Sequence, residues 1–326
     1  MNILVSGAGG ILGRYMCRAL LEAGHTVVGL SRNPAAAQRH LEGESRMQWR
    51  EGDILDVAAL EKALENIDLV VHAAGLVSFL PEDRNRLLKI NGEGTANMVN
   101  ACLAQGNIKK LIHISSVTCL SPSRPMPSEV DERQGFNPDK NTSDYAISKY
   151  AAEMEVCRGV EEGLPAVMLN PSIVLAPGLD GESSASLVHY ASKPRLFYPS
   201  GWLNFVDARD LAAIVCNMVE KSPSEGQRMV VSGGCIPYRD FFGLIASKKG
   251  IRPPMVKTGS ILSALAWRLA AAASFFTGKK PLLTRFTAAS AGRQFIYRGI
   301  ALEQYLGSFA FRKIEDSLDW IIGRSA

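Results

Sequence analysis

Residues 2–13, NILVSGAGGILG, form a short apolar run that passes directly into a glycine-rich turn. The apolar spacing from Ile11 to Ala23 predicts a helix immediately after this turn. In a strand-turn-helix unit of this kind Gly7 permits the tight turn, Gly10 lets a pyrophosphate approach the backbone, and Gly13 lets the helix pack closely. The N–H groups at the start of the helix then face the phosphates. The stretch therefore predicts a dinucleotide-binding turn.

Short apolar runs alternate with amphipathic helical segments up to Asn170, which is typical of βαβ units and a parallel sheet. The strands that we expect are 2–6, 26–30, 47–51, 69–72, 110–115 and 166–170. Residues 1–170 are thus expected to form a Rossmann-like, doubly wound dinucleotide-binding domain of the α/β class.

After Pro171 this alternation breaks, because Gly, Pro and Ser punctuate the following segments. We expect a smaller substrate-binding lobe, formed by residues 171–203 and 233–326. Residues 204–232 are expected to return to the sheet with a helix, which Asp210 would cap and which would run through Val219, and with a further strand, 228–231.

The composition excludes several classes of protein. The 326 residues include 36 basic and 32 acidic ones, a net charge of +4, without a long run of like charge, so we expect no nucleic-acid partner. The cysteines occur singly and away from histidine, which predicts reduced thiols and no metal site. They are Cys17, Cys102, Cys119, Cys157, Cys216 and Cys235. The chain opens with a strand instead of a secretory signal, so we expect a cytoplasmic protein.

The longest apolar segment, Ile261–Phe276, carries Arg268 in its middle and is rich in alanine. It is too short for a membrane span, so we expect a packed or lid helix and no integral membrane segment. Peripheral contact with a membrane stays an alternative, because aromatic residues of the segment lie close to Lys279 and Lys280 in the sequence.

The second expected strand ends in Gly29-Leu-Ser31-Arg32 and lacks the acidic residue that usually binds the ribose 2′-hydroxyl of NAD. Ser31 and Arg32 instead offer a hydroxyl and a guanidinium to a 2′-phosphate. The pattern favours NADP over NAD, with NAD as the alternative.

A second motif is Tyr145-Ala-Ile-Ser-Lys149, in which the phenol and the amine lie one helical turn apart on one face. A neighbouring ammonium and a positive nicotinamide ring would lower the pKa of Tyr145 and make it a usable acid or base. The fifth strand ends in Ser115 and Ser116, at the edge where ligands bind, and one of these hydroxyls is expected to donate to a substrate oxygen.

Together these motifs resemble those of the extended short-chain dehydrogenase/reductase family, which belongs to the NAD-dependent epimerase/dehydratase superfamily and includes dihydroflavonol reductases, β-hydroxysteroid dehydrogenases and sugar-nucleotide epimerases. The resemblance extends over nearly the whole chain. The further matching motifs are Gly52-Asp53, His72-Ala-Ala-Gly75, Asn91-Gly-Glu-Gly94-Thr95, Asn170-Pro171 and Asn204-Phe-Val206. Two motifs depart from the family pattern: Asn170-Pro171 stands where Arg-Pro is usual, and Cys119-Leu-Ser121 where many epimerases have Val-Tyr-Gly.

The resemblance implies a role for each matching position. Asp53 would contact the adenine, Asn91 would support a proton relay or Lys149, and Ser116 would be the catalytic serine, with Ser115 as the alternative. The expected catalytic residues are Ser116, Tyr145, Lys149 and Asn91. The expected cofactor-binding residues are Gly7, Gly9, Gly10, Ile11, Leu12, Gly13, Ser31, Arg32, Asp53, Ile54, Ala73, Ala74, Gly75, Ile114, Ser115, Tyr145, Lys149, Pro171, Ser172 and Ile173.

The predicted activity is an NADP-dependent oxidoreductase that transfers hydride between the nicotinamide and a carbonyl or secondary alcohol of a small molecule. One alternative is a nucleotide-sugar epimerase or dehydratase with tightly bound NAD, and another is a protein that binds the dinucleotide without chemistry. The candidate substrate-pocket residues are 76–79, 186–190, 197–198 and Trp202. The helices expected at 91–105 and 144–162 resemble those that pair across a two-fold axis in this family, so the resemblance implies a symmetric homodimer.

Overall fold

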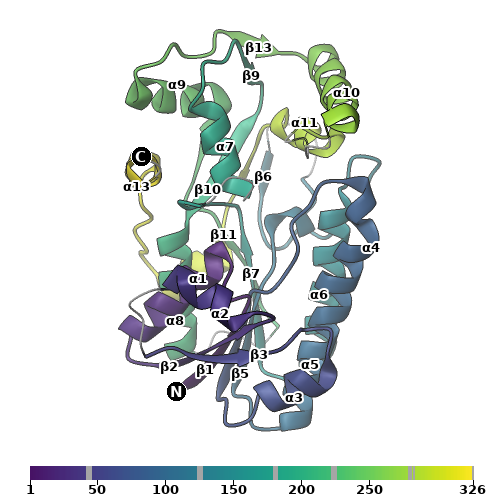
Figure 1. Ribbon diagram of the computed structural model, residues 1–326, viewed down its shortest axis with the longest axis vertical. Helices are drawn as coiled ribbons and strands as arrows, with labels where there is room; N and C mark the ends of the chain where they lie inside the picture. The colour runs from purple at the N-terminus through teal and green to yellow at the C-terminus, as the bar shows by residue number, and fades with distance from the viewer. Residues whose placement is uncertain are drawn as a thin grey trace.

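A seven-stranded parallel sheet forms the centre of the protein (Figure 1). The computed structural model describes residues 1–41, 46–122, 128–178, 183–221, 226–277, 281 and 283–324. In order across the sheet, the strands are β11 (Arg228–Val231), β7 (Ala166–Pro171), β5 (Lys110–Ile114), β4 (Leu69–His72), β1 (Asn2–Ser6), β2 (Thr26–Ser31) and β3 (Gln48–Glu51). The strand order reverses between β1 and β4, and in open α/β sheets this reversal creates a crevice at the carboxyl ends of the strands.

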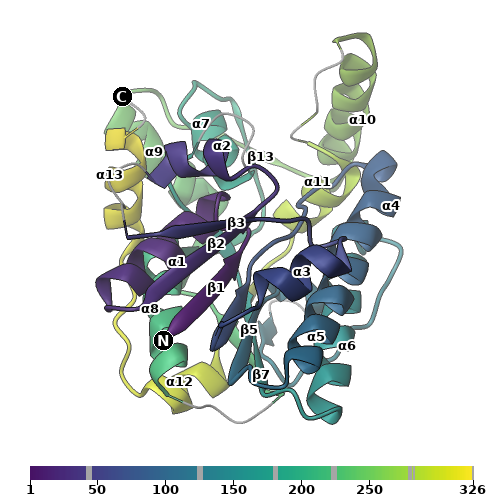
Figure 2. The same ribbon diagram turned by 60° about the horizontal axis from the view of Figure 1, so that its bottom comes forward.

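Helices cover both faces of this sheet, so its strands are apolar on both sides (Figure 2). α1 (Ile11–Glu22) and α8 (Ala208–Glu220) cover one face, and α3 (Val57–Ala63), α5 (Gly94–Gln105) and α6 (Asp144–Glu161) cover the other. Successive strand residues point to opposite faces. Accordingly, Ile3 and Val5 join the core under α1, whereas Leu4 joins the core under α5. The predicted Rossmann-like α/β fold is therefore confirmed.

The predicted strands are all present, with ends that differ by one residue in β2, β3, β5 and β7. One capping prediction was wrong, because α8 is capped by Asp207, whose carboxylate accepts a hydrogen bond from the backbone N–H of Arg209 at 2.8 Å. Asp210 lies inside the first turn of α8. Its carboxylate accepts instead from the backbone N–H of Arg312 at 2.8 Å, which ties the C-terminal segment to this helix.

The second lobe contains three small sheets. Their strands are β12 (Gly234–Pro237), β10 (Trp202–Asp207) and β8 (Ile173–Leu175); β13 (Val256–Thr258) and β9 (Phe197–Pro199); and β14 (Phe295–Tyr297) and β6 (Ser128–Val130). The boundaries differ from those expected, because β10 belongs to a small sheet and only α8 and β11 return to the main one. Conversely, Ala301 and Leu302 join the core of the main sheet, although they follow residue 233.

The remaining helical segments are α2 (Pro34–Gln38), η1 (Arg39–Leu41), η2 (Pro81–Asp83), α4 (Arg84–Leu87), the π-helix η3 (Leu88–Glu93), η4 (Val117–Cys119), α7 (Ser183–Ala191), α9 (Tyr238–Lys249), α10 (Ser260–Thr277), α11 (Arg285–Ala291), α12 (Ile300–Leu306) and α13 (Ile314–Arg324). Within the described ranges, none of the helices has the length and apolarity needed to cross a membrane. The six cysteines are free thiols, three of them buried and three half-buried.

Candidate functional site

The glycine-rich turn between β1 and α1 packs directly against the backbone of the loop that follows β4. Gly7 has a φ of +71°, and a Cβ at this position would lie 2.8 Å from the Cα of Ala74. A Cβ at Gly13 would lie 2.1 Å from the carbonyl oxygen of Gly7, so α1 can start this close to the strand only with glycine there. At Gly10 the closest contact would be 3.2 Å, which is a weaker constraint. The turn therefore exposes backbone, as phosphate binding requires.

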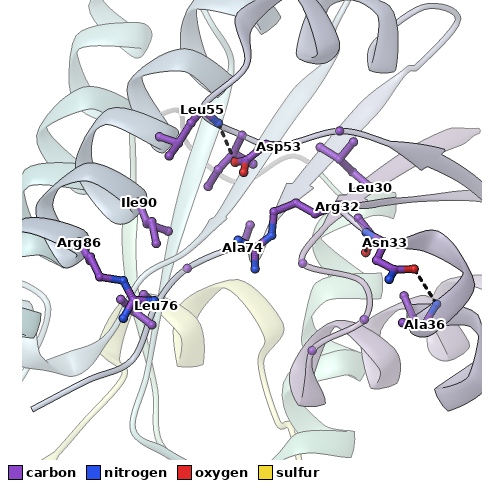
Figure 3. A pocket seen from close by; sticks show the side chains of 18 residues that line it. Leu30, Arg32, Asn33, Ala36, Asp53, Leu55, Ala74, Leu76, Arg86 and Ile90 are labelled. Carbon is purple, nitrogen blue, oxygen red and sulfur yellow. Dashed lines mark hydrogen bonds between the residues drawn. The ribbon is translucent and has the colours of Figure 1, made fainter. Parts of the chain in front are cut away.

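A cavity of about 480 Å³ opens beside this turn, at the carboxyl ends of β1, β2 and β4 (Figure 3). Of the predicted cofactor residues, it is lined by Gly7, Gly9, Gly10, Ser31, Arg32, Asp53, Ile54, Ala74 and Gly75. The other predicted cofactor residues lie outside its lining; they are Ile11, Leu12, Gly13, Ala73, Ile114, Ser115, Tyr145, Lys149, Pro171, Ser172 and Ile173. Its size and its backbone-lined floor fit a dinucleotide.

The edge of the cavity at the end of β2 carries one guanidinium beside several polar side chains. Arg32 is exposed and its side chain points into the cavity (Figure 3), and within the described part of the chain no acidic side chain pairs with it. The hydroxyl of Ser31 accepts from the backbone N–H of Asn33 at 3.2 Å, and the side chain of Asn33 caps α2. Asp53 lies on the neighbouring loop, where its carboxylate accepts from the backbone N–H of Leu55 at 3.0 Å.

Sequence analysis missed part of the lining. Asn33, Ala36 and Ala37 come from α2, and a Cβ at Gly9 would lie only 2.8 Å from the Cβ of Ala37. Arg86 comes from α4, where its guanidinium pairs with Asp83 at 2.7 Å. Nothing in the local sequence distinguishes these residues, because only the folded chain brings α2 and α4 to the cavity.

The predicted catalytic side chains converge at the carboxyl end of β5. α6 begins with Ser143, whose hydroxyl accepts from the backbone N–H of Ala146 at 3.1 Å, and this cap fixes the first turn that carries Tyr145. The side chain of Ser116 is near enough to the phenol of Tyr145 to lower its pKa, and its hydroxyl accepts from the backbone N–H of Thr118 at 3.2 Å. The buried Nζ of Lys149 donates to the carbonyl oxygen of Ile114 at 2.6 Å.

The pKa of Tyr145 does not follow the expectation from sequence. Burial raises it to about 12, and the side chain of Ser116 opposes this rise. The expectation also counted the charge of a bound nicotinamide ring; in the protein alone Lys149 is not among the groups that shift this pKa, and its ammonium is held on the carbonyl of Ile114. Burial also lowers the pKa of Lys149.

The two candidate serines have different surroundings. The hydroxyl of Ser115 donates to the buried carboxylate of Glu153, and a guanidinium nitrogen of Arg228 lies 2.7 Å from the other oxygen of that carboxylate. Asn170, which stands where the family usually has arginine, donates from its amide both to Glu153 and, at 2.9 Å, to the carbonyl oxygen of Ser116. The side chain of Ser115 is therefore committed to a structural network, whereas that of Ser116 faces Tyr145.

A second buried network lies beneath the cofactor end and uses neutral groups. The hydroxyl of Ser6 is 2.7 Å from Nδ1 of His72, and Nε2 of His72 is 3.0 Å from the hydroxyl of Thr95. Thr95 donates to the carbonyl oxygen of Asn91 at 2.6 Å, so its oxygen accepts from His72, which places the histidine proton on Nε2. Ser6 in turn accepts from the backbone N–H of Ala74 at 3.1 Å.

The side chain of Asn91 is hydrogen-bonded to the backbone of Leu76 and to Ser148. Its side chain accepts from the N–H of Leu76 at 2.7 Å and donates to the carbonyl oxygen of Leu76 and to the hydroxyl of Ser148. The role at Lys149 that the resemblance implied is not among these contacts.

Of the candidate substrate-pocket residues, Phe79 packs edge-on against the ring of Tyr145, with 5.6 Å between ring centroids. Tyr190 instead packs against Phe242 in the second lobe.

Comparison with known proteins gives one matching family model. The model of the NAD dependent epimerase/dehydratase family matches residues 3–232. Cinnamoyl-CoA reductase 1 from Petunia hybrida is 30% identical over 239 residues, which cover 69% of this chain and 71% of the relative. Sterol demethylase protein B from Methylococcus capsulatus is 28% identical over 238 residues, which cover 72% of this chain and 70% of that protein.

Solved structures extend the likeness to both lobes. The crystal structure of gox2253 superimposes with a TM-score of 0.81 at 27% identity, over 98% of this chain and 96% of the other. UDP-glucuronic acid 4-epimerase from Bacillus cereus, solved with NAD, gives a TM-score of 0.74 at 21% identity, over 99% of both chains. This second likeness shows a shared fold.

Proposed function

Because the chain belongs to the NAD-dependent epimerase/dehydratase family, an enzyme family of the extended short-chain dehydrogenase/reductase type, we propose that it is an NADP-dependent oxidoreductase. The proposed reaction transfers hydride between the nicotinamide and a carbonyl or secondary alcohol of a small molecule. The observation that carries the proposal is the convergence of Ser116, Tyr145 and Lys149 at the carboxyl end of β5, on the same edge of the sheet as the dinucleotide-sized cavity. Several relatives are named reductases, which supports a net oxidation or reduction of the substrate over an epimerisation.

In the proposed mechanism Ser116 donates a hydrogen bond to the substrate oxygen and stabilises the negative charge that develops there. Tyr145 delivers the proton to this oxygen in reduction and removes it in oxidation. Lys149 would hold the nicotinamide ribose of a bound cofactor, and its positive charge would there favour the phenolate of Tyr145. The bound NADP supplies or accepts the hydride.

The turn residues would hold the pyrophosphate, with Gly7 and Gly10 presenting backbone and the start of α1 presenting N–H groups. Ser31 and Arg32 would bind the 2′-phosphate, which is the basis for preferring NADP. Asp53 and Ile54 would contact the adenine. Ala73, Gly75 and the segment 171–173 would lie along the nicotinamide half.

Replacing Tyr145 by phenylalanine tests the chemical role. We expect Tyr145→Phe to lower the rate of NADPH-dependent reduction by about 10²–10⁴, because the proton donor is lost while the ring and its packing on Phe79 remain. The assay uses NADPH with aldehydes, ketones and CoA thioesters, and calorimetry of NADPH binding serves as the control. Undiminished turnover by Tyr145→Phe would refute the role, and NAD that stays bound without net consumption would favour the epimerase alternative.

We further propose that the enzyme is a symmetric homodimer through α5 and α6. These two helices lie side by side on the outer layer of the domain (Figure 2), and Met154 exposes 37% of its surface there. Light scattering should give twice the chain mass of 35.3 kDa, and a charge at Met154 should reduce it to one chain.

A further inference from the structure

Helix α10 projects from the body of the second lobe, with α11 at its base (Figure 2). Leu262, Leu265 and Leu269 expose 37%, 53% and 61% of their surface. Their spacing of three and four residues places them on one face of the helix. The only charged residue of α10 is Arg268, whose guanidinium lies 4.5 Å above the ring of Trp267 and donates to the carbonyl oxygen of Ala264. The helix thus presents an apolar stripe that nothing in the described chain covers.

The same end of the molecule exposes further apolar residues beside basic ones. β13 and β9 lie at this end with α10 (Figure 1), and just before and within β13 the side chains of Met255 and Val256 are 84% and 39% exposed. Arg252 and Lys257 flank this pair and are exposed. In the described parts of the chain no acidic side chain forms an ion pair with either of them.

Charge is strongly segregated along the sequence that contains this surface. Residues 241–302 include ten lysines and arginines and not one aspartate or glutamate, a net charge of +10. The rest of the chain has 26 basic and 32 acidic residues, a net charge of −6. The small overall charge therefore hides a basic segment, and this segment contains the exposed apolar helix.

We propose that α10 and the adjoining end of β13 form a docking surface for a bilayer that contains anionic lipids. The apolar stripe would enter the boundary between headgroups and acyl chains, and the basic residues would face the lipid phosphates. Since α10 cannot span a bilayer, it would lie in the plane of the interface. A second copy of this chain is a poorer occupant, because a two-fold contact would set the exposed basic residues Arg252 and Lys257 of one copy against those of the other.

Vesicle co-sedimentation of the full chain tests this proposal. The matched variants are Leu269→Glu on α10 and Val57→Glu on α3, at the opposite end of the molecule (Figure 1); both residues are exposed, and both changes add one negative charge. With phosphatidylcholine vesicles that contain 30% phosphatidylglycerol, we expect binding by the wild type and by Val57→Glu. Leu269→Glu should bind at least about tenfold more weakly, because a carboxylate enters the lipid boundary.

Binding should weaken at high salt and be much lower on pure phosphatidylcholine, since the basic residues act through screened attraction. Circular dichroism and thermal unfolding establish that both variants are folded. The proposal is overturned if the wild type does not bind anionic vesicles at low salt, or if Leu269→Glu and Val57→Glu bind equally. A concentration-dependent dimer that Leu269→Glu abolishes would assign the stripe to a second copy instead.

Discussion

The two buried networks behind the site differ in the kind of interaction that holds them. Beneath the cofactor end, Ser6, His72 and Thr95 are joined by neutral hydrogen bonds. Behind the catalytic end, Glu153 and Arg228 form an ion pair, and the side chain of Glu153 is fully buried. In the proposed mechanism the cofactor end needs only a fixed backbone shape, whereas the catalytic end would move a proton and would need a fixed field as well. The two halves of the site should therefore respond differently to mutation and to pH.

The largest effect is expected where the charged network loses one partner. Glu153→Gln keeps an oxygen for Ser115 and Asn170 but leaves the guanidinium of Arg228 largely buried without its counter-charge. We expect a loss of about 3 kcal/mol in the free energy of unfolding, measured by urea denaturation. Since the carbonyl of Ser116 is tied to the same network, the rate of reduction should also fall.

The double variant Glu153→Gln with Arg228→Met is the control for this prediction. Removing both charges should recover at least half of the lost stability, because an uncompensated charge is the main cost. If the single and the double variant are equally destabilised, the ion pair does not hold this end of the site.

The neutral network should show a smaller effect. His72→Leu leaves the hydroxyl of Ser6 without its acceptor and the hydroxyl of Thr95 without its donor, which should cost about 2 kcal/mol of unfolding free energy. His113 supplies the matched control, because it is equally buried, its ring centroid lies 5.4 Å from that of His72, and neither of its ring nitrogens has a hydrogen-bond partner in the described chain. At pH 8, His113→Leu should therefore change stability little, and an equal loss in both variants would contradict the assignment.

Burial depresses the pKa of both histidines, that of His72 to about 3. The unfolded chain takes up protons near pH 6.5, whereas the folded protein does so only at much lower pH. The two histidines therefore leave the free energy of unfolding unchanged above pH 6.5, and below it each lowers this free energy by about 1.4 kcal/mol per pH unit until it is protonated in the folded protein. The difference in unfolding free energy between wild type and His113→Leu should change with this slope, and a difference independent of pH would contradict it.

The contrast also explains which features the sequence could predict. The glycine turn and the pair Tyr145 and Lys149 are local patterns, because turn geometry and one helical turn bring their members together. The ion pair of Glu153 with Arg228 depends on β11 lying beside β7, a contact across 75 residues that no spacing encodes. From the sequence, Asn170 was only a departure from a motif. The structure shows that its amide donates to Glu153 and to the carbonyl oxygen of Ser116.

Other differences have similar causes. Residues 204–232 were expected to return to the main sheet, but β10 joins a small sheet, because a local sequence pattern does not say which sheet a strand joins. Asp207 and Asp210 are both suitable caps, and the choice depends on where the chain leaves β10. The pKa of Tyr145 depends on burial, which is a property of the packed site and not of the motif.

The preference for NADP is the claim on which the proposed activity can be tested without knowing the substrate. Isothermal titration with NADPH and with NADH, on wild type and on Arg32→Ala, measures it directly once the protein is known to be free of copurified cofactor. The account predicts that NADPH binds wild type at least tenfold more tightly, about 1.4 kcal/mol, and that Arg32→Ala removes this margin while NADH binding stays unchanged. Tighter binding of NADH, or NAD already bound after purification, would contradict it.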